Sequence, residues 1–136
     1  MKKLICFGIL GFISSFAFAE DWVLIGKSHQ DKTYLNVKSL KISNIYGQSY
    51  LKAWVKFEIY NDVVKDGLSL GDYTLVLYQI DCNQQKIGEV SVVNYKNKMV
   101  YGKTKDVAFP NMTDIVPGTV GETILDTSCE TYKYKN

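Results

Sequence analysis

The stretch Asp72-Tyr-Thr-Leu-Val-Leu-Tyr-Gln-Ile-Asp-Cys82 decides how we interpret the rest of the chain. It reads as a β-strand, in which successive side chains point to opposite faces. If the C-terminal segment that carries Cys129 covers one of these faces, a single disulfide would fasten that cover to the sheet. One predicted face carries Thr74, Val76, Tyr78, Ile80 and Cys82, and the other carries Tyr73, Leu75, Leu77, Gln79 and Asp81.

The beginning of the chain has the features of a secretory signal peptide. It is basic (Met-Lys-Lys), then mostly apolar from Leu4 to Phe18, and a small-x-small cleavage site ends at Ala19. We expect residues 1–19 to be removed and residues 20–136 to form a single exported domain. A membrane anchor is the alternative, but crossing a bilayer takes about 20 apolar residues. Cys6 lies at the start of the apolar run, so we expect no lipid anchor.

The charge composition argues against a nucleic-acid partner. All 16 basic residues are lysines, against 14 acidic residues, and removal of the signal peptide leaves 14 of each. Arginine, which the chain lacks, is the residue best suited to bidentate contacts with phosphate and guanine. We therefore expect no nucleic acid among the partners.

The cysteines predict one structural disulfide. Cys6 leaves with the signal peptide, so Cys82 and Cys129 remain, with one possible pairing. An exported protein meets an oxidising compartment, where such a pair normally forms a disulfide. The alternatives are a redox pair, which usually has a Cys-x-x-Cys spacing, or zinc, which needs more ligands than these two cysteines and His29 supply. We expect no metal and no cofactor.

Alternating apolar residues predict a sheet of antiparallel strands. The longest run, Gln48 to Tyr60, places Leu51, Ala53, Val55, Phe57 and Ile59 on a core face. Short strands separated by turns are typical of a meander, whereas residues 38–46 show no sustained period. The other predicted strands are Trp22–Gly26, Thr33–Val37, Ile87–Tyr95 and Met99–Lys103.

One short helix is expected near the C-terminus. Pro117-Gly118 ends the sheet, and Thr119-x-x-Glu122 matches a capping box. Residues 130–136 are expected to be a frayed tail. The predicted fold class is therefore α+β: an antiparallel β-sheet meander with one short C-terminal helix tethered to the sheet by a disulfide.

Two groups of residues are candidates for binding a partner. Tyr50, Trp54 and Tyr60 share the second face of the longest strand and could anchor a protein, or they could pack under loops. The second group surrounds a predicted hairpin tip and could attract an acidic surface or a polyanion, although such lysines usually discourage strand pairing at an edge. Its members are Lys96, Lys98, Lys103 and Lys105.

No set of residues specifies a reaction. His29, the only histidine, follows Ser28 in a polar turn, and no Gly-x-Ser-x-Gly motif accompanies them. The three aspartates of residues 61–72 lack the ligand pattern of a calcium loop. We expect no catalytic residues and no metal ligands.

Several landmarks follow one another along the chain: Trp22–Gly26, Tyr34–Leu40, Trp54–Tyr60, Asp81-Cys82, Tyr95, and Pro117–Thr119 through Cys129. Taken in this order, they resemble the surface-adhesin protein E family of Gram-negative bacteria. The family includes lipid-anchored adhesins that bind host matrix and serum proteins, and the resemblance implies an antiparallel sheet with a disulfide-tethered C-terminal helix. This chain lacks the lipoprotein cysteine to which such an anchor would be attached. We therefore expect an exported protein without a lipid anchor, located in the periplasm, at the cell surface or outside the cell.

These observations lead to one main functional hypothesis and two alternatives. We expect an exported, non-enzymatic, adhesin-like binding module that engages a protein through a sheet face or hairpin edge. The partner would be a host matrix or serum protein, or a second copy in a homodimer. The alternatives are a small secreted or periplasmic enzyme inhibitor of the lysozyme-inhibitor type and a hydrolase that depends on His29.

Overall fold

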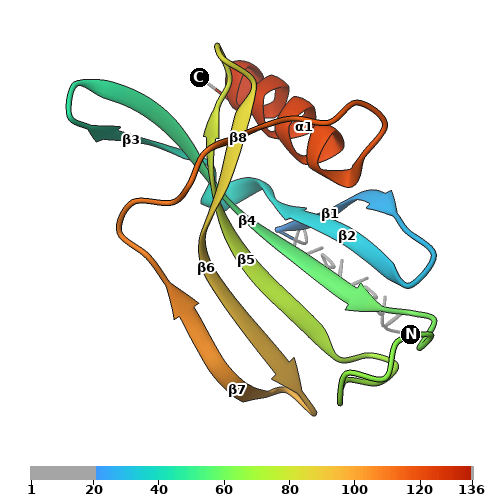
Figure 1. The fold of residues 1–136 in the computed structure, drawn as a ribbon. Coiled ribbons are helices and arrows are strands. Elements are labelled where there is room, and N and C mark those ends of the chain that lie inside the picture. The colour runs from blue at the N-terminus through green and yellow to red at the C-terminus, as the bar shows by residue number, and fades with distance from the viewer. Residues whose placement is uncertain (1–20, 136) are drawn as a thin grey trace, which may run out of the picture.

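The computed structural model describes residues 21–135, so the expected signal peptide lies outside the described residues. Figure 1 shows a strongly twisted sheet with one helix packed across part of one face. The helices are the 3₁₀ turn η1 (Val37–Ser39) and α1 (Val120–Lys135). The strands are β1 (Trp22–Lys27), β2 (Asp31–Asn36), β3 (Lys41–Ile45), β4 (Gln48–Ile59), β5 (Tyr73–Asp81), β6 (Lys86–Lys96), β7 (Met99–Asp106) and β8 (Thr113–Asp114).

The sheet topology confirms the predicted α+β meander. The strands follow the order β1-β2-β4-β5-β6-β7, and all pairings are antiparallel. Two short strands lie off this path: β3 pairs with the first half of β4, and β8 pairs with β6. Neither was expected, because β3 lies in the stretch without a period and β8 is two residues long.

The register between β4 and β5 confirms the two predicted faces of both strands. Leu51 lies opposite Ile80, and Val55 lies opposite Val76. These side chains are almost fully buried and form the core with residues of α1. The buried cluster consists of Leu35, Leu40, Leu51, Ala53, Val55, Ile80, Ile124 and Leu125.

Helix α1 begins where the sequence predicts but ends later. The Thr119 hydroxyl accepts a hydrogen bond from the Glu122 amide at 3.4 Å, whereas the Glu122 carboxylate accepts from the amide of Gly118 instead of Thr119. The expected frayed tail was wrong, because α1 continues to Lys135. Tyr132 packs against the buried cluster, and this contact gives the last turns an apolar anchor that their sequence does not reveal.

The predicted disulfide is present. Cys82, which follows β5, is bonded to Cys129 in α1 with an Sγ–Sγ distance of 2.06 Å. The bond joins residues 47 positions apart, so it ties the covering helix to the end of the central strand. It therefore fastens the two halves of the core together.

Asp72 connects the long loop before β5 to the β6–β7 hairpin. Its carboxylate accepts hydrogen bonds from the amides of Ser69 at 2.9 Å and Asn97 at 3.0 Å. Because these bonds favour the ionised form, they lower the pKa of Asp72 below its ordinary value. The carboxylate thus acts as a buried structural link.

Replacing both disulfide cysteines with serine tests the role of the tether. The Cys82→Ser/Cys129→Ser variant should lose up to about 4 kcal/mol of unfolding free energy, because the unfolded chain regains the entropy of an open 47-residue loop. Urea denaturation measures this loss. The native protein in reductant is the control and should unfold at the same urea concentration as the variant; an unchanged midpoint in both would contradict the prediction.

Asp72→Asn tests the buried link through its pH dependence. A pKa that is lower in the folded state contributes stability above the ordinary aspartate value of about 3.9, and this stability is lost as the pH falls through the folded-state pKa. The melting temperature of Asp72→Asn should therefore lie below that of the native protein at pH 7, and the difference should narrow at pH 3. Asp126→Asn, on the exposed side of α1, should change little at either pH.

Candidate functional site: the outer face of the sheet

Because α1 packs on one side of the sheet, the opposite side forms a second face, which we call the outer face (Figure 1). Cross-strand pairing assigns its residues, because directly paired residues of antiparallel strands lie on the same face. Residues of β1 to β6 contribute to it. The members are Trp22, Leu24 and Lys27 of β1; Lys32 and Tyr34 of β2; Lys41 of β3; Tyr50, Lys52, Trp54, Lys56 and Glu58 of β4; Tyr73, Leu75, Leu77 and Gln79 of β5; and Ser91, Val93 and Tyr95 of β6.

The middle of the outer face is apolar. Trp54 lies opposite Leu77, and Leu75 lies opposite Val93. All four side chains are only half-buried. A half-buried apolar centre on a sheet is typical of a surface that a second layer or a partner covers.

Beside this centre, the ammonium group of Lys56 is enclosed by aromatic rings. It lies 4.7 Å from the ring centroid of Tyr34, 5.3 Å from that of Trp22 and 5.8 Å from that of Tyr73. The Glu58 carboxylate is 3.8 Å away. A cation over an aromatic face is attracted by the ring quadrupole, so Lys56 holds rings from β1, β2 and β5 around β4. We call these four residues and Glu58 the Lys56 cage.

The three aromatic residues singled out from the sequence do not form one compact cluster. Tyr50 and Trp54 lie on the outer face, as their spacing indicates. Tyr60 lies beyond the end of β4, where its hydroxyl donates to the Ser28 carbonyl. Ten residues of extended chain, roughly 33 Å, separate Tyr50 from Tyr60.

The aromatic residues of the Lys56 cage were missed by the sequence analysis. Trp22, Tyr34 and Tyr73 come from three strands, and Tyr95 of β6 extends the group by stacking on Tyr73 with ring centroids 4.9 Å apart. Each lies at a second-face position of a strand that the sequence did predict. The missing information was the register, which brings these positions next to one another.

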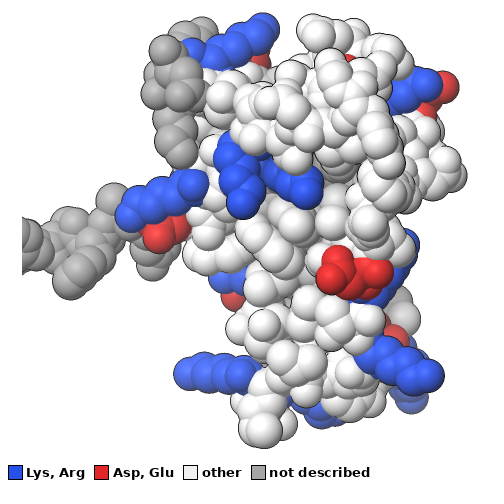
Figure 2. All heavy atoms as spheres, turned by 90° about the vertical axis from the view of Figure 1, so that its left-hand side faces the viewer, with Lys and Arg blue, Asp and Glu red and all other residues white. Residues whose placement is uncertain are grey.

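The predicted basic edge is only partly available for binding. The Lys96 ammonium donates to the Gly67 carbonyl and lies over the Tyr101 ring, and Lys105 is 3.3 Å from the Glu89 carboxylate. Lys98 and Lys103 are exposed and make no ion pair with any described residue. Figure 2 shows the lysines on this side of the molecule spread over the surface instead of gathered in one patch.

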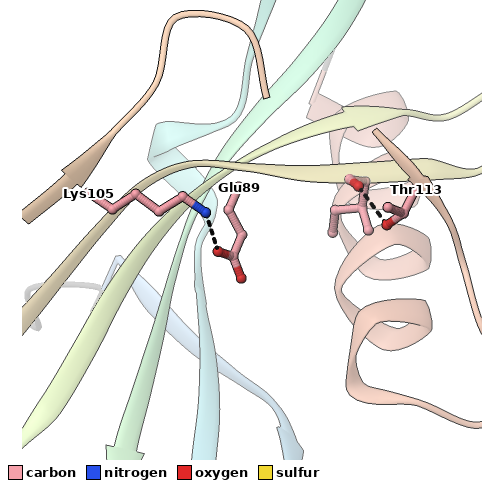
Figure 3. Close-up of polar contacts among 4 residues, drawn as sticks. Glu89, Lys105 and Thr113 are labelled. Atoms are coloured by element: carbon pink, nitrogen blue, oxygen red, sulfur yellow. Dashed lines mark hydrogen bonds and ion pairs between the residues drawn. The ribbon is translucent and has the colours of Figure 1, made fainter. Parts of the chain in front are cut away.

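A cavity of about 550 Å³ lies on the other side of the sheet, next to the start of α1. Lys105 of β7 and Glu89 of β6 point toward one another at this place, and Thr113 lies close to α1 (Figure 3). Burial and the Glu89 carboxylate raise the pKa of Tyr78 in the cavity well above its ordinary value. The Tyr78 phenol therefore stays neutral, which does not suit it to act as a nucleophile or base at neutral pH.

The remaining candidates for chemistry lie apart from these surfaces. His29 is exposed in the turn between β1 and β2. Within residues 21–135, no group of three or more histidine, cysteine, aspartate or glutamate side chains is placed to hold a metal ion. The outer face, with its half-buried apolar centre and neighbouring aromatic rings, is therefore the candidate functional site.

Comparison with known proteins gives one match. A family model described as Surface-adhesin protein E matches residues 22–130, which extends from β1 into α1. No curated protein and no solved structure matches the chain.

Lys56→Met tests whether the cage stabilises the outer face. Methionine keeps much of the side-chain volume but removes the charge, so this variant should lose about 1–2 kcal/mol of unfolding free energy. Lys52→Met is the matched control, because it lies on the same strand and face without a ring contact or ion pair within residues 21–135, and it should change stability by less than about 0.5 kcal/mol. Urea denaturation compares them, and equal losses would rule out a specific role for the cage.

Proposed function

This chain belongs to the surface-adhesin protein E family, and we propose that it is an exported, non-enzymatic binding module that engages a protein partner through its outer face. Family membership places it among adhesin-like surface proteins. By resemblance to adhesins of this family, the proposed partner is a host matrix or serum protein. The outer face adds a site to that general role.

The observation that carries the proposal is the composition of the outer face. Its apolar centre, with Trp54 and Leu77 paired across β4 and β5, is half-buried and is flanked by the aromatic rings of the Lys56 cage. Protein interfaces are enriched in tryptophan and tyrosine, and a few such residues near the centre usually supply most of the binding free energy. Trp54 occupies this position here.

The Lys56 cage also prepares the face for binding. The ammonium of Lys56 fixes the rings of Trp22, Tyr34 and Tyr73 before any partner arrives. Side chains that are already ordered lose little conformational entropy on association, so more of the contact energy remains as affinity. A sheet face held by cross-strand contacts provides such ordered side chains, whereas flexible loops would not.

Export agrees with the chemistry of the chain. The Cys82–Cys129 disulfide needs an oxidising compartment, and residues 1–19 have the pattern of a cleaved signal peptide. Within residues 21–135, no helix is both long enough and apolar enough to cross a bilayer. We propose that the mature protein acts in the periplasm, at the cell surface or outside the cell.

Serine substitutions at the centre of the face test the proposed function. Trp54→Ser and Tyr50→Ser should each leave the fold intact, and Trp54→Ser should weaken partner binding at least about 30-fold, the loss expected for a hot-spot residue. Biolayer interferometry against a panel of purified host matrix and serum proteins measures the affinity, and circular dichroism verifies the fold.

The control is an aromatic residue away from the face. Tyr46, at the tip of the β3–β4 hairpin, is 90% exposed and has a positive φ of 49°, so Tyr46→Asn keeps a residue that tolerates this backbone conformation. It should bind like the native protein. Full binding by a folded Trp54→Ser variant would refute the proposed face.

A further inference from the structure

Two pairs of lysines lie directly opposite one another on the outer face. Lys27 of β1 is the cross-strand partner of Lys32 of β2, and Lys41 of β3 is the cross-strand partner of Lys52 of β4. Like charges in directly opposed positions destabilise a sheet. None of these four lysines forms an ion pair with any residue from 21 to 135.

The acidic residues of this region do not neutralise the two lysine pairs. Glu58 is 3.8 Å from Lys56, and Asp21 is 2.6 Å from Lys38. Lys27 and Lys32 share only the ring of Tyr60, at 4.6 and 5.9 Å from its centroid. The half of the outer face formed by β1 to β4 therefore carries four lysines that make no ion pair within residues 21–135; Glu58, which lies opposite Lys32, pairs with Lys56 instead.

This positive surface does not follow from the overall composition. The whole chain has a net charge of only +2. Many acids lie on the opposite side of the molecule, where Asp31 faces Asp66 beside the core and where α1 carries Glu122, Asp126 and Glu130. Nor do the lysines only protect an edge, because Lys52 lies on a strand that is paired on both sides.

We infer that the outer face binds an acidic protein surface whose carboxylates meet the two lysine pairs. This inference rests on the proposed function and specifies the chemistry of the partner. Lys32 lies opposite Glu58, and Glu58 is six residues from Lys52 along β4. The Lys27–Lys32 and Lys41–Lys52 pairs therefore lie roughly 20 Å apart. The apolar centre around Trp54 lies between them. The matching surface is an apolar patch with acidic groups at its two ends.

The apolar centre favours a protein over an acidic polysaccharide. A polysaccharide would neutralise the lysines but would offer little apolar surface to Trp54, Leu75 and Leu77. A protein surface can satisfy both, with apolar contacts at the centre and charged groups at the rim, which is the usual arrangement of an interface. The lysines would also speed association with an acidic partner in a salt-dependent manner.

The test uses variants that separate folding from binding. In the Lys27→Glu/Lys41→Glu variant, each opposed pair of lysines becomes a Glu–Lys pair, so the melting temperature should rise or stay constant. Binding to an acidic partner should nevertheless fall by more than 10-fold. Lys98→Glu/Lys103→Glu makes the same change of charge in the β6–β7 turn and on β7 and should alter binding less than twofold. If these lysines had a purely structural role, a variant that is as stable as the native protein or more stable would not lose binding.

The probe is a fluorescein-labelled synthetic peptide with a glutamate block at each end of a leucine- and phenylalanine-rich centre. Fluorescence anisotropy at 50 and 300 mM NaCl should show binding that weakens with salt, and a peptide with scrambled order should bind more weakly. Heparin is the polysaccharide comparison. Binding of heparin without binding of the ordered peptide would overturn the inference, as would equal losses of binding in the Lys27→Glu/Lys41→Glu and Lys98→Glu/Lys103→Glu variants.

Failure of the inference and failure of the proposed function give different results. If Trp54→Ser abolishes binding to a panel protein while Lys27→Glu/Lys41→Glu binds it normally, the outer face still binds a partner and the inferred acidity is wrong. If neither variant affects binding, both the face and the acidic partner are wrong. If Trp54→Ser and Lys27→Glu/Lys41→Glu both weaken binding while Lys98→Glu/Lys103→Glu binds normally, the proposed function and the acidic partner are both supported.

Discussion

The register between β4 and β5 is the constraint on which the rest of this structure depends. Side chains alternate along a strand, so a slip of one residue would exchange the two faces of the sheet. With Leu51 opposite Ile80 and Val55 opposite Val76, the apolar set meets α1, and Trp54 with Leu77 is left on the outer face. The disulfide then holds α1 on the side that this register defines. The core and the outer face are thus two results of one pairing.

Local patterns in the sequence account for much of the fold. Period-2 alternation predicted β4 because its two sides differ in polarity, the largely apolar stretch that leads to Cys82 predicted β5, and the cysteine count left one possible disulfide. The end of α1 was not predictable in the same way. The sequence after Cys129 has no strong helical pattern, and its last turns depend on the contact of Tyr132 with the core. Short strands such as β8 are likewise defined by their partner, not by their own residues.

The candidate site was harder to predict because it is assembled across strands. Reading along β4 found Trp54 but grouped it with Tyr60, which belongs to the far end of the sheet. Clustering in sequence also favoured the lysines near the β6–β7 hairpin, two of which have intramolecular partners. The lysines that gather in space come from separate segments, and only the pairing of β1 with β2 and of β3 with β4 places them opposite one another.

Two groups of charged residues on the outer face differ in whether the chain itself supplies partners for their charges. The Lys56 cage is internally complete, since its cation meets three rings and a carboxylate. The opposed lysine pairs are not, because each brings two like charges together and lowers the stability of the free chain. A ligand that binds only the folded state stabilises that state by mass action. If carboxylates of a partner relieve this repulsion, binding and folding are coupled, and the free protein gives up stability at the positions where its partner restores it.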